Sequence, residues 1–73
     1  MKISDRALEY FRREGISRIK LSLYFDCSIK IKIEVIERSN DVKNVEVIID
    51  EDAKPLLEGL MLDYEDTLFL RPE

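Results

Sequence analysis

Two stretches of alternating apolar and polar residues restrict the fold of this chain more than any other feature. They are SRIKLSLYFD, residues 17–26, and SIKIKIEVIE, residues 28–37. From Ile19 to Phe25, and again from Ile29 to Val35, an apolar residue occupies every second position. Because successive side chains of a β-strand point to opposite faces, this period predicts two strands, each buried on one face and solvated on the other.

The segment between these stretches, residues 26–28, contains Cys27, the only cysteine of the chain. A single strand through residues 18–37 would be far longer than the strands of globular proteins, which usually have about 3–10 residues. We therefore expect the chain to bend or turn at residues 26–28. The signal for this turn is modest, because the segment contains no glycine, proline or asparagine.

The residues before the first stretch predict an amphipathic helix. Ser4 is a good N-cap, since its hydroxyl accepts a hydrogen bond from a backbone N–H that has no partner in the first turn. Ala7, Leu8 and Phe11 recur at helical spacing and form an apolar stripe. Gly15 is expected to end the helix, because glycine adopts the left-handed conformation of many C-terminal caps without steric cost.

The second half of the chain predicts shorter elements. In chain order we expect a polar loop at residues 38–44, a third strand at residues 45–50, a short strand or turn at residues 60–64 and a last strand at residues 67–70. Asp50 is expected to cap a short helix, which contains Pro55 and ends at Gly59.

The predicted elements follow the order α-β-β-β-α-β in a single domain, residues 1–73. This order favours an α+β fold, with a small, mostly antiparallel β-sheet and two short helices on one side of it. A chain of 73 residues buries only about 60% of the surface that it exposes when unfolded. Its core is therefore thin, and we expect it to self-associate as a homo-oligomer, most simply a dimer, or to bind a protein partner.

The charge pattern bears on partners and on location. The chain has 12 Lys and Arg against 16 Asp and Glu, which gives a formal net charge of −4. The only basic pair, Arg12 and Arg13, stands beside Glu14, so we expect no nucleic-acid partner. No apolar run approaches about 18 residues, so we expect no membrane-spanning helix. Charged residues interrupt the first ten positions, so no signal peptide is expected, and a lone cysteine favours a cytoplasmic protein.

Catalytic motifs are missing from the sequence. With no histidine there is no Ser-His-Asp triad and no Cys-His pair. Two acidic clusters, residues 50–52 and the group Asp63, Glu65 and Asp66, have the residue types that bind hard cations or carry acid–base chemistry. A helix cap explains the first cluster and a solvated turn explains the second. We therefore predict that the protein is not an enzyme.

Cys27 has two interpretations. It has the same parity as Phe25 and Ile29, so it would face the core if both strands continued without a change of register, and free cysteine packs well as a small apolar residue. As a ligand it would supply one thiolate, whereas zinc and iron–sulfur clusters take about four ligands. A symmetric dimer would bring two thiolates together only if Cys27 lay near the two-fold axis.

The stretch VEVIIDEDAKPLLEGLMLDYEDTLFLRPE, residues 45–73, resembles the second half of the HesB/IscA-like domain of A-type iron–sulfur cluster assembly and carrier proteins. In that family a strand runs into an Asp, a short helix follows, and then comes a Leu-x-Gly-x-x-Leu-Asp-Tyr segment. The matching positions here are residues 47–50, residues 53–57 and residues 57–64. Ile3 and Ser4 resemble the start of the family's first helix, and a strand then reaches Cys27 where the family has a cysteine.

The resemblance implies the HesB-like fold. The chain departs from the family pattern at Ile29, where the family has a glycine, and at Arg71, where it has an asparagine. The family's C-terminal Cys-Gly-Cys has no counterpart in these residues. The resemblance therefore implies a degenerate relative that is accessory to iron–sulfur cluster biogenesis, with Cys27 as the only candidate ligand for an iron–sulfur cluster or iron. The alternative is a protein-binding module that keeps the fold and binds no cluster.

Overall fold

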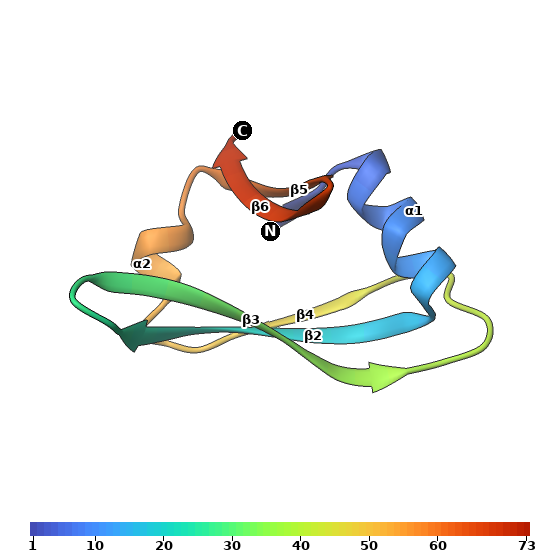
Figure 1. Ribbon diagram of the computed structural model, residues 1–73, viewed down its shortest axis with the longest axis horizontal. Helices are drawn as coiled ribbons and strands as arrows, with labels where there is room; N and C mark the ends of the chain where they lie inside the picture. Colours follow the sequence, from blue (N-terminus) through green and yellow to red (C-terminus); the bar gives the residue numbers. More distant parts are fainter.

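The fold consists of two three-stranded sheets that face each other across a thin core (Figure 1). The computed structural model describes residues 1–73. In chain order the elements are β1 (Lys2–Ile3), α1 (Asp5–Glu14), β2 (Ile16–Phe25), β3 (Ile29–Arg38), β4 (Glu46–Ile49), α2 (Lys54–Leu57), β5 (Leu60–Glu65) and β6 (Thr67–Pro72). In Figure 1 the two helices lie at opposite ends of the molecule, between the sheets. The α+β class expected from the sequence is confirmed.

β2 is the central strand of the first sheet, which has the order β3-β2-β4 and is called the hairpin sheet below. β2 pairs antiparallel with β3 and parallel with β4. Leu21 of β2 lies opposite both Ile33 of β3 and Ile49 of β4, so apolar side chains meet on one face across all three strands. This pairing confirms the two strands that the alternating stretches predict.

The second sheet, called the terminal sheet, has the order β1-β5-β6. β1 pairs parallel with β5, where Ile3 lies opposite Leu62, and β6 pairs antiparallel with β5. The prediction of one small sheet is therefore wrong, although the two longest pairings are antiparallel as expected. β1 has only two residues, too few for alternation to mark it. After α2 the chain turns at Gly59, where φ is 79°, and begins the second sheet instead of returning to the first.

Both predicted caps of α1 are present. Ser4 Oγ accepts a hydrogen bond from the Ala7 N–H at 3.1 Å. Gly15 ends the helix in the left-handed conformation, with φ at 68°, and its N–H points to carbonyls of the last turn. A Cβ atom at Gly15 would lie 3.0 Å from the Ser39 carbonyl oxygen, so the position favours glycine for two reasons.

The start of α2 differs from the prediction. Asp50 was expected as the N-cap, but a turn at residues 51–53 follows it and the helix begins at Lys54, with Ala53 at the cap position. Pro55 sets this start, because proline lacks an N–H and fits only the first turn of a helix. The helix ends at Leu57, before Gly59, because Glu58 already has extended backbone.

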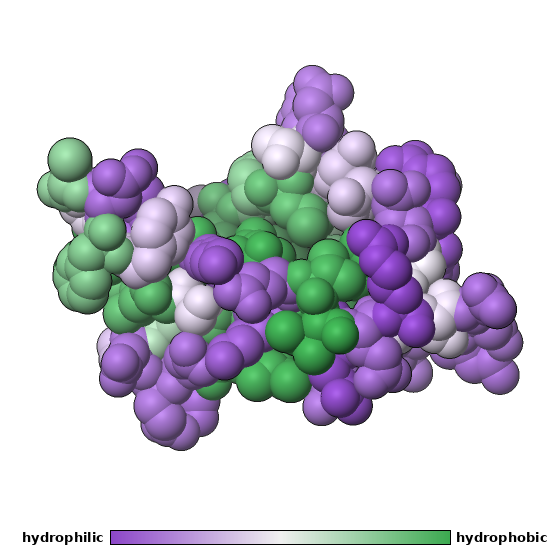
Figure 2. Space-filling view, turned by 60° about the horizontal axis from the view of Figure 1, so that its bottom comes forward, coloured by the Kyte–Doolittle hydropathy of each residue, from purple (hydrophilic) through white to green (hydrophobic).

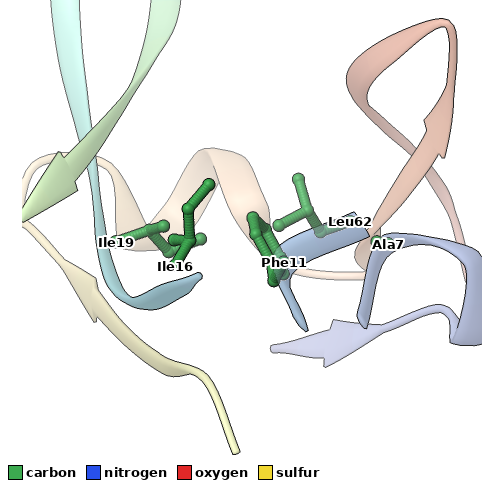
Figure 3. Packing of buried hydrophobic residues seen from close by; sticks show 5 residues of the cluster. All are labelled: Ala7, Phe11, Ile16, Ile19 and Leu62. Atoms are coloured by element: carbon green, nitrogen blue, oxygen red, sulfur yellow. The ribbon is translucent and has the colours of Figure 1, made fainter. Parts of the chain in front are cut away.

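The core between the sheets is small. Only 11 of 73 residues are buried, which agrees with the thin core expected for this length. The larger cluster joins α1, β2 and β5, and Figure 3 shows its five members: Ala7, Phe11, Ile16, Ile19 and Leu62. A second cluster of Leu21, Ala53 and Leu57 lies under α2. The two clusters hold the helices against the hairpin sheet and leave the far end of the β2–β3 hairpin uncovered.

Candidate functional site

The β2–β3 hairpin ends in a three-residue turn that contains Cys27. The last residue pair of the ladder joins Phe25 to Ile29. The Asp26 N–H donates a hydrogen bond to the Ser28 carbonyl oxygen at 3.0 Å, which closes the turn. Cys27 itself has φ at 64°, a left-handed conformation that is uncommon for residues other than glycine, asparagine and aspartate. The turn expected at residues 26–28 is therefore confirmed.

Of the two interpretations of Cys27, packing into the core does not hold, because its side chain is exposed. The neighbours of the same parity are exposed as well: Phe25 is 78% and Ile29 is 56% accessible. The alternation of apolar and polar residues continues to the end of the hairpin. The residues that cover its apolar face do not extend that far. The cluster under α2 reaches Leu23 and Ile31 and stops there. The hairpin therefore projects beyond the core by its turn and two residue pairs, Tyr24 with Lys30 and Phe25 with Ile29.

Four exposed side chains form what we call the tip surface: Tyr24, Phe25, Cys27 and Ile29. Tyr24 is 41% exposed and lies on the opposite face of β2 from Phe25. Asp26 in the turn and Lys30 of β3 form an ion pair, with Nζ to Oδ2 at 3.7 Å, so their charges offset each other. Figure 2 shows hydrophobic surface at the end of the molecule where this hairpin turns.

Metal-ligating side chains do not gather anywhere in the fold. No group of three or more His, Cys, Asp or Glu residues is placed to hold a metal ion. Two residues of the cluster at positions 50–52 pair with lysines instead: Asp50 with Lys20 at 3.5 Å, and Glu51 with Lys54 at 3.0 Å. One thiolate per chain does not fit an iron–sulfur cluster, which takes about four ligands. Cys27 is thus accessible, but it has no further ligand beside it.

Asp63 was expected in a solvated turn, and this expectation is wrong. Asp63 lies inside β5 and is completely buried. Its Oδ1 accepts hydrogen bonds from Ser4 Oγ at 2.6 Å and from the Tyr64 N–H at 2.8 Å. Its Oδ2 accepts from Arg6 Nη2 at 2.9 Å and from Arg71 Nε at 2.6 Å. One carboxylate therefore joins the N-terminal end of α1 to β5 and β6.

These contacts keep Asp63 ionised. The Ser4 hydroxyl is the largest single cause that lowers the pKa of the Asp63 carboxyl, and burial acts in the opposite direction. Arg71, the Tyr64 N–H and Arg6 lower the pKa further, so the net result lies far below the ordinary range. A carboxylate with four donors and such a low pKa cannot act as a general base. Its role is to hold three elements together.

The sequence carried only a weak signal for Asp63. It directly follows three apolar residues, 60–62, in a segment that ends a buried strand pattern. Its partners Ser4, Arg6 and Arg71 are 59, 57 and 8 residues away. Since nothing local identifies these partners, only the pairing of β1 and β6 with β5 brings them to one point.

An open apolar groove of about 390 Å3 lies between β3 and the β5–β6 turn. Its walls are mainly apolar, and include Ile31, Ile33 and Val35 of β3. Tyr10 and Tyr64 stack at its side with ring centroids 4.2 Å apart. Asp66 and Thr67 are its two polar lining residues and the other seven are apolar or aromatic, so the groove is better suited to contact than to catalysis.

The chain was compared with protein-family models and with curated proteins. No protein-family model matches the chain, and no curated protein matches it. The resemblance of residues 45–73 to the HesB/IscA-like domain therefore stays a prediction. As for membranes, neither helix has the length and apolar character needed to cross one.

Proposed function

We propose that the protein is a non-enzymatic protein-binding domain and that the tip surface is the part that contacts its partner. The observation that carries this proposal is the exposure of Phe25, which is 78% accessible on a hairpin that the fold otherwise holds in register. An aromatic side chain in water at a projecting turn contributes nothing to the core of its own chain. It is, however, the kind of residue that dominates the energy of protein interfaces.

The tip surface also has the form of a good anchor. The ladder of β2 and β3 runs without a register shift from Ile19 to Phe25, so the turn stands on a regular ribbon. A rigid aromatic side chain loses little conformational freedom on binding, which lowers the cost of association. Because Asp26 and Lys30 offset each other, the tip is suited to an apolar pocket with little net charge on the partner protein.

The rest of the molecule supports binding over catalysis. Asp63 is the only carboxylate buried in the fold, and all its hydrogen bonds go to structural partners. No histidine is available as a general base. Seven of the nine residues that line the apolar groove are hydrophobic. These observations support binding as the function, with Cys27 as the one exposed thiol.

A photo-crosslinker attached to Cys27 tests this proposal, because it places the reactive group within the tip surface. The control is Cys27→Ser with the single cysteine moved to Asn40, in the exposed loop at the opposite end of β3. The protein captured only from Cys27 is then purified. Its affinity is measured for the parent, for Phe25→Ser, and for Ile48→Ser, which alters an exposed apolar residue of β4.

We expect Phe25→Ser to weaken the measured affinity by about tenfold or more, the effect of losing an interface anchor. Ile48→Ser should leave the affinity within about twofold of the parent. If both variants bind as tightly as the parent, the tip surface is not the contact and the proposal is wrong. Equal weakening by both would point to a change of fold and not to a local contact.

The exposure of Cys27 favours a second candidate, an accessory role in iron–sulfur cluster biogenesis. A chain with one thiol needs its other ligands from a second copy, a partner protein or a small thiol. Anaerobic reconstitution with iron and sulfide, beside Cys27→Ala, tests it through visible absorption and iron bound per chain. Charge-transfer bands and iron in the parent alone would support this role. Their absence from both proteins would end it and leave the binding domain.

A further inference from the structure

β3 is a long strand with a free side. It lies at the edge of the hairpin sheet, and only its β2 side is paired. β3 has ten residues, whereas the other edge strands β4, β6 and β1 have four, six and two. An unpaired edge presents a row of N–H and C=O groups that another strand can bind. β3 is therefore the best template for strand pairing in the molecule.

The usual devices that block such an edge are weak in β3. It contains no proline, and its two register shifts with β2 lie between Ile16 and Ile19, opposite the Arg38 end of β3. Val35 and Ile36 are 43% and 45% exposed, so the edge also carries apolar surface in contact with water. Lys30 and Lys32 charge the edge, but Glu34 follows them, and the Lys32 Nζ lies 3.0 Å from its Oε1.

The order of charges along β3 selects one way of pairing the strand with a copy of itself. Residues directly opposite in an antiparallel pair share a face, so apolar residues meet apolar residues only when the two-fold axis passes through a residue. An axis through Ile33 places each Lys32 opposite a Glu34 and each Ile31 opposite a Val35.

The neighbouring positions of the axis are unfavourable. An axis through Lys32 would set two lysines directly opposite each other, and an axis through Glu34 would set two glutamates together. Like charges directly opposite destabilise a strand pair, whereas opposite charges stabilise it. Of these three centres, only Ile33 sets opposite charges together without placing like charges directly opposite each other.

We propose that two copies of the protein form a symmetric dimer in which β3 pairs antiparallel with β3 of the second copy, centred on Ile33. The two hairpin sheets then continue into one sheet of six strands. The second β3 extends the apolar floor of the groove, which Ile31, Ile33 and Val35 line in the single chain. A small domain with a thin core gains buried apolar surface by this association.

The dimer is independent of the tip surface. Because the strands run antiparallel, the two hairpin turns lie at opposite ends of the dimer and away from its axis. Phe25→Ser is therefore expected to leave the dimer intact, and loss of the dimer is expected to leave each tip surface exposed. The two proposals fail separately.

A charge-swap experiment tests the interface and its register. Sedimentation equilibrium is measured for the parent, for Lys32→Glu, for Glu34→Lys, and for an equimolar mixture of these two variants. Both side chains are exposed, so the fold is retained, and circular dichroism checks this. Lys54→Glu is the matched control, because Lys54 and Glu51 form an exposed pair of the same length, 3.0 Å, away from β3.

The parent is expected to be a dimer. Each single variant sets like charges opposite each other twice, so its dimer dissociation constant should rise by about tenfold or more. The mixture restores opposite charges at both positions and should dimerise again, while Lys54→Glu should dimerise like the parent. A monomeric parent, or single variants that dimerise as tightly as the parent, would overturn the proposal. Failure of the mixture to dimerise would overturn the register centred on Ile33.

Discussion

The Asp63 network and the tip surface differ in which kind of side chain is buried and which is exposed. At Asp63 a charge is completely buried, and four donors from α1, β5 and β6 surround it. At the tip an aromatic ring is exposed, and one loose ion pair between Asp26 and Lys30 stands beside it. A buried charge persists only when its hydrogen bonds are complete, since an unpaired one is very costly.

The contrast shows which part of this small fold is fixed by contacts between elements and which part has no such contacts. The Asp63 network fixes the relative positions of α1 and the terminal sheet. The tip of the hairpin is held by its own ladder alone, and nothing in the chain covers it. Substitutions near Asp63 are therefore expected to change stability, whereas substitutions at the tip are expected to change binding.

The largest expected difference comes from removing the same ring in the two regions. Phe11 is fully buried beside Leu62, and Phe25 is 78% exposed. Phe11→Ala should lower the free energy of unfolding by about 3–5 kcal/mol, because it leaves a cavity in the core. Phe25→Ala should change it by less than about 0.5 kcal/mol. Urea unfolding measures both values, and losses of similar size would contradict the contrast.

The next effect comes from neutralising one carboxylate in each region. Asp63→Asn removes the charge that Arg6 and Arg71 neutralise and presents amide hydrogens to donors, so Tm should fall by roughly 10 °C or more. Asp26→Asn removes an exposed pair, and Tm should move by only about 2 °C or less. Circular dichroism during thermal unfolding measures the Tm of the parent and of both variants. A small change at Asp63 would mean that the network contributes little to stability.

At acid pH the Tm difference between the parent and Asp63→Asn should become smaller. The pKa of Asp63 is lowered in the folded protein, so the unfolded chain, with a pKa of about 3.9, takes up the proton first as pH falls. The stabilisation is present at neutral pH and declines below about pH 4. Asp26→Asn is the control, because it neutralises an exposed carboxylate that has a single ion pair, with Lys30. A Tm difference that is constant from neutral pH to about pH 2 would refute the assignment to Asp63.

The smallest effect concerns the backbone of the tip. Cys27 and Asp66 both have φ at 64°, one at the tip and one in the β5–β6 turn. Glycine relieves the strain of this conformation but increases the entropy of the unfolded chain, so Cys27→Gly should change stability by no more than about 1 kcal/mol. Asp66→Gly should relieve less strain than Cys27→Gly, because aspartate tolerates the left-handed region better than cysteine. A large loss for Cys27→Gly would show that the thiol makes a stabilising contact.

Local features of the fold were predictable, and those that depend on distant segments were not. The alternation around Leu21 and Ile33, the turn at residues 26–28 and the caps at Ser4 and Gly15 each depend on a few neighbouring residues. The second sheet depends on a two-residue strand that pairs across the whole chain, and no local pattern marks such a strand.

The candidate site followed the same rule. The sequence identified Cys27 as the only thiol, but its parity predicted burial, because parity gives the face of a strand and not what covers that face. Asp63 looked like part of an acidic turn, since its three side-chain partners lie in other elements. Exposure at the tip and burial at Asp63 both follow from where α1, α2 and β6 come to lie.

The Asp63 network affects the order in which the chain can fold during its synthesis. During synthesis, Ser4 and Arg6 are made early, whereas Asp63 and Arg71 are made some sixty residues later. β1 likewise waits for its only partner strand, β5. The β2–β3 hairpin needs none of these residues and can pair as soon as it emerges. The nascent chain would therefore expose the free edge of β3 before β5 is available to fix Ser4 and Arg6 at the start of α1.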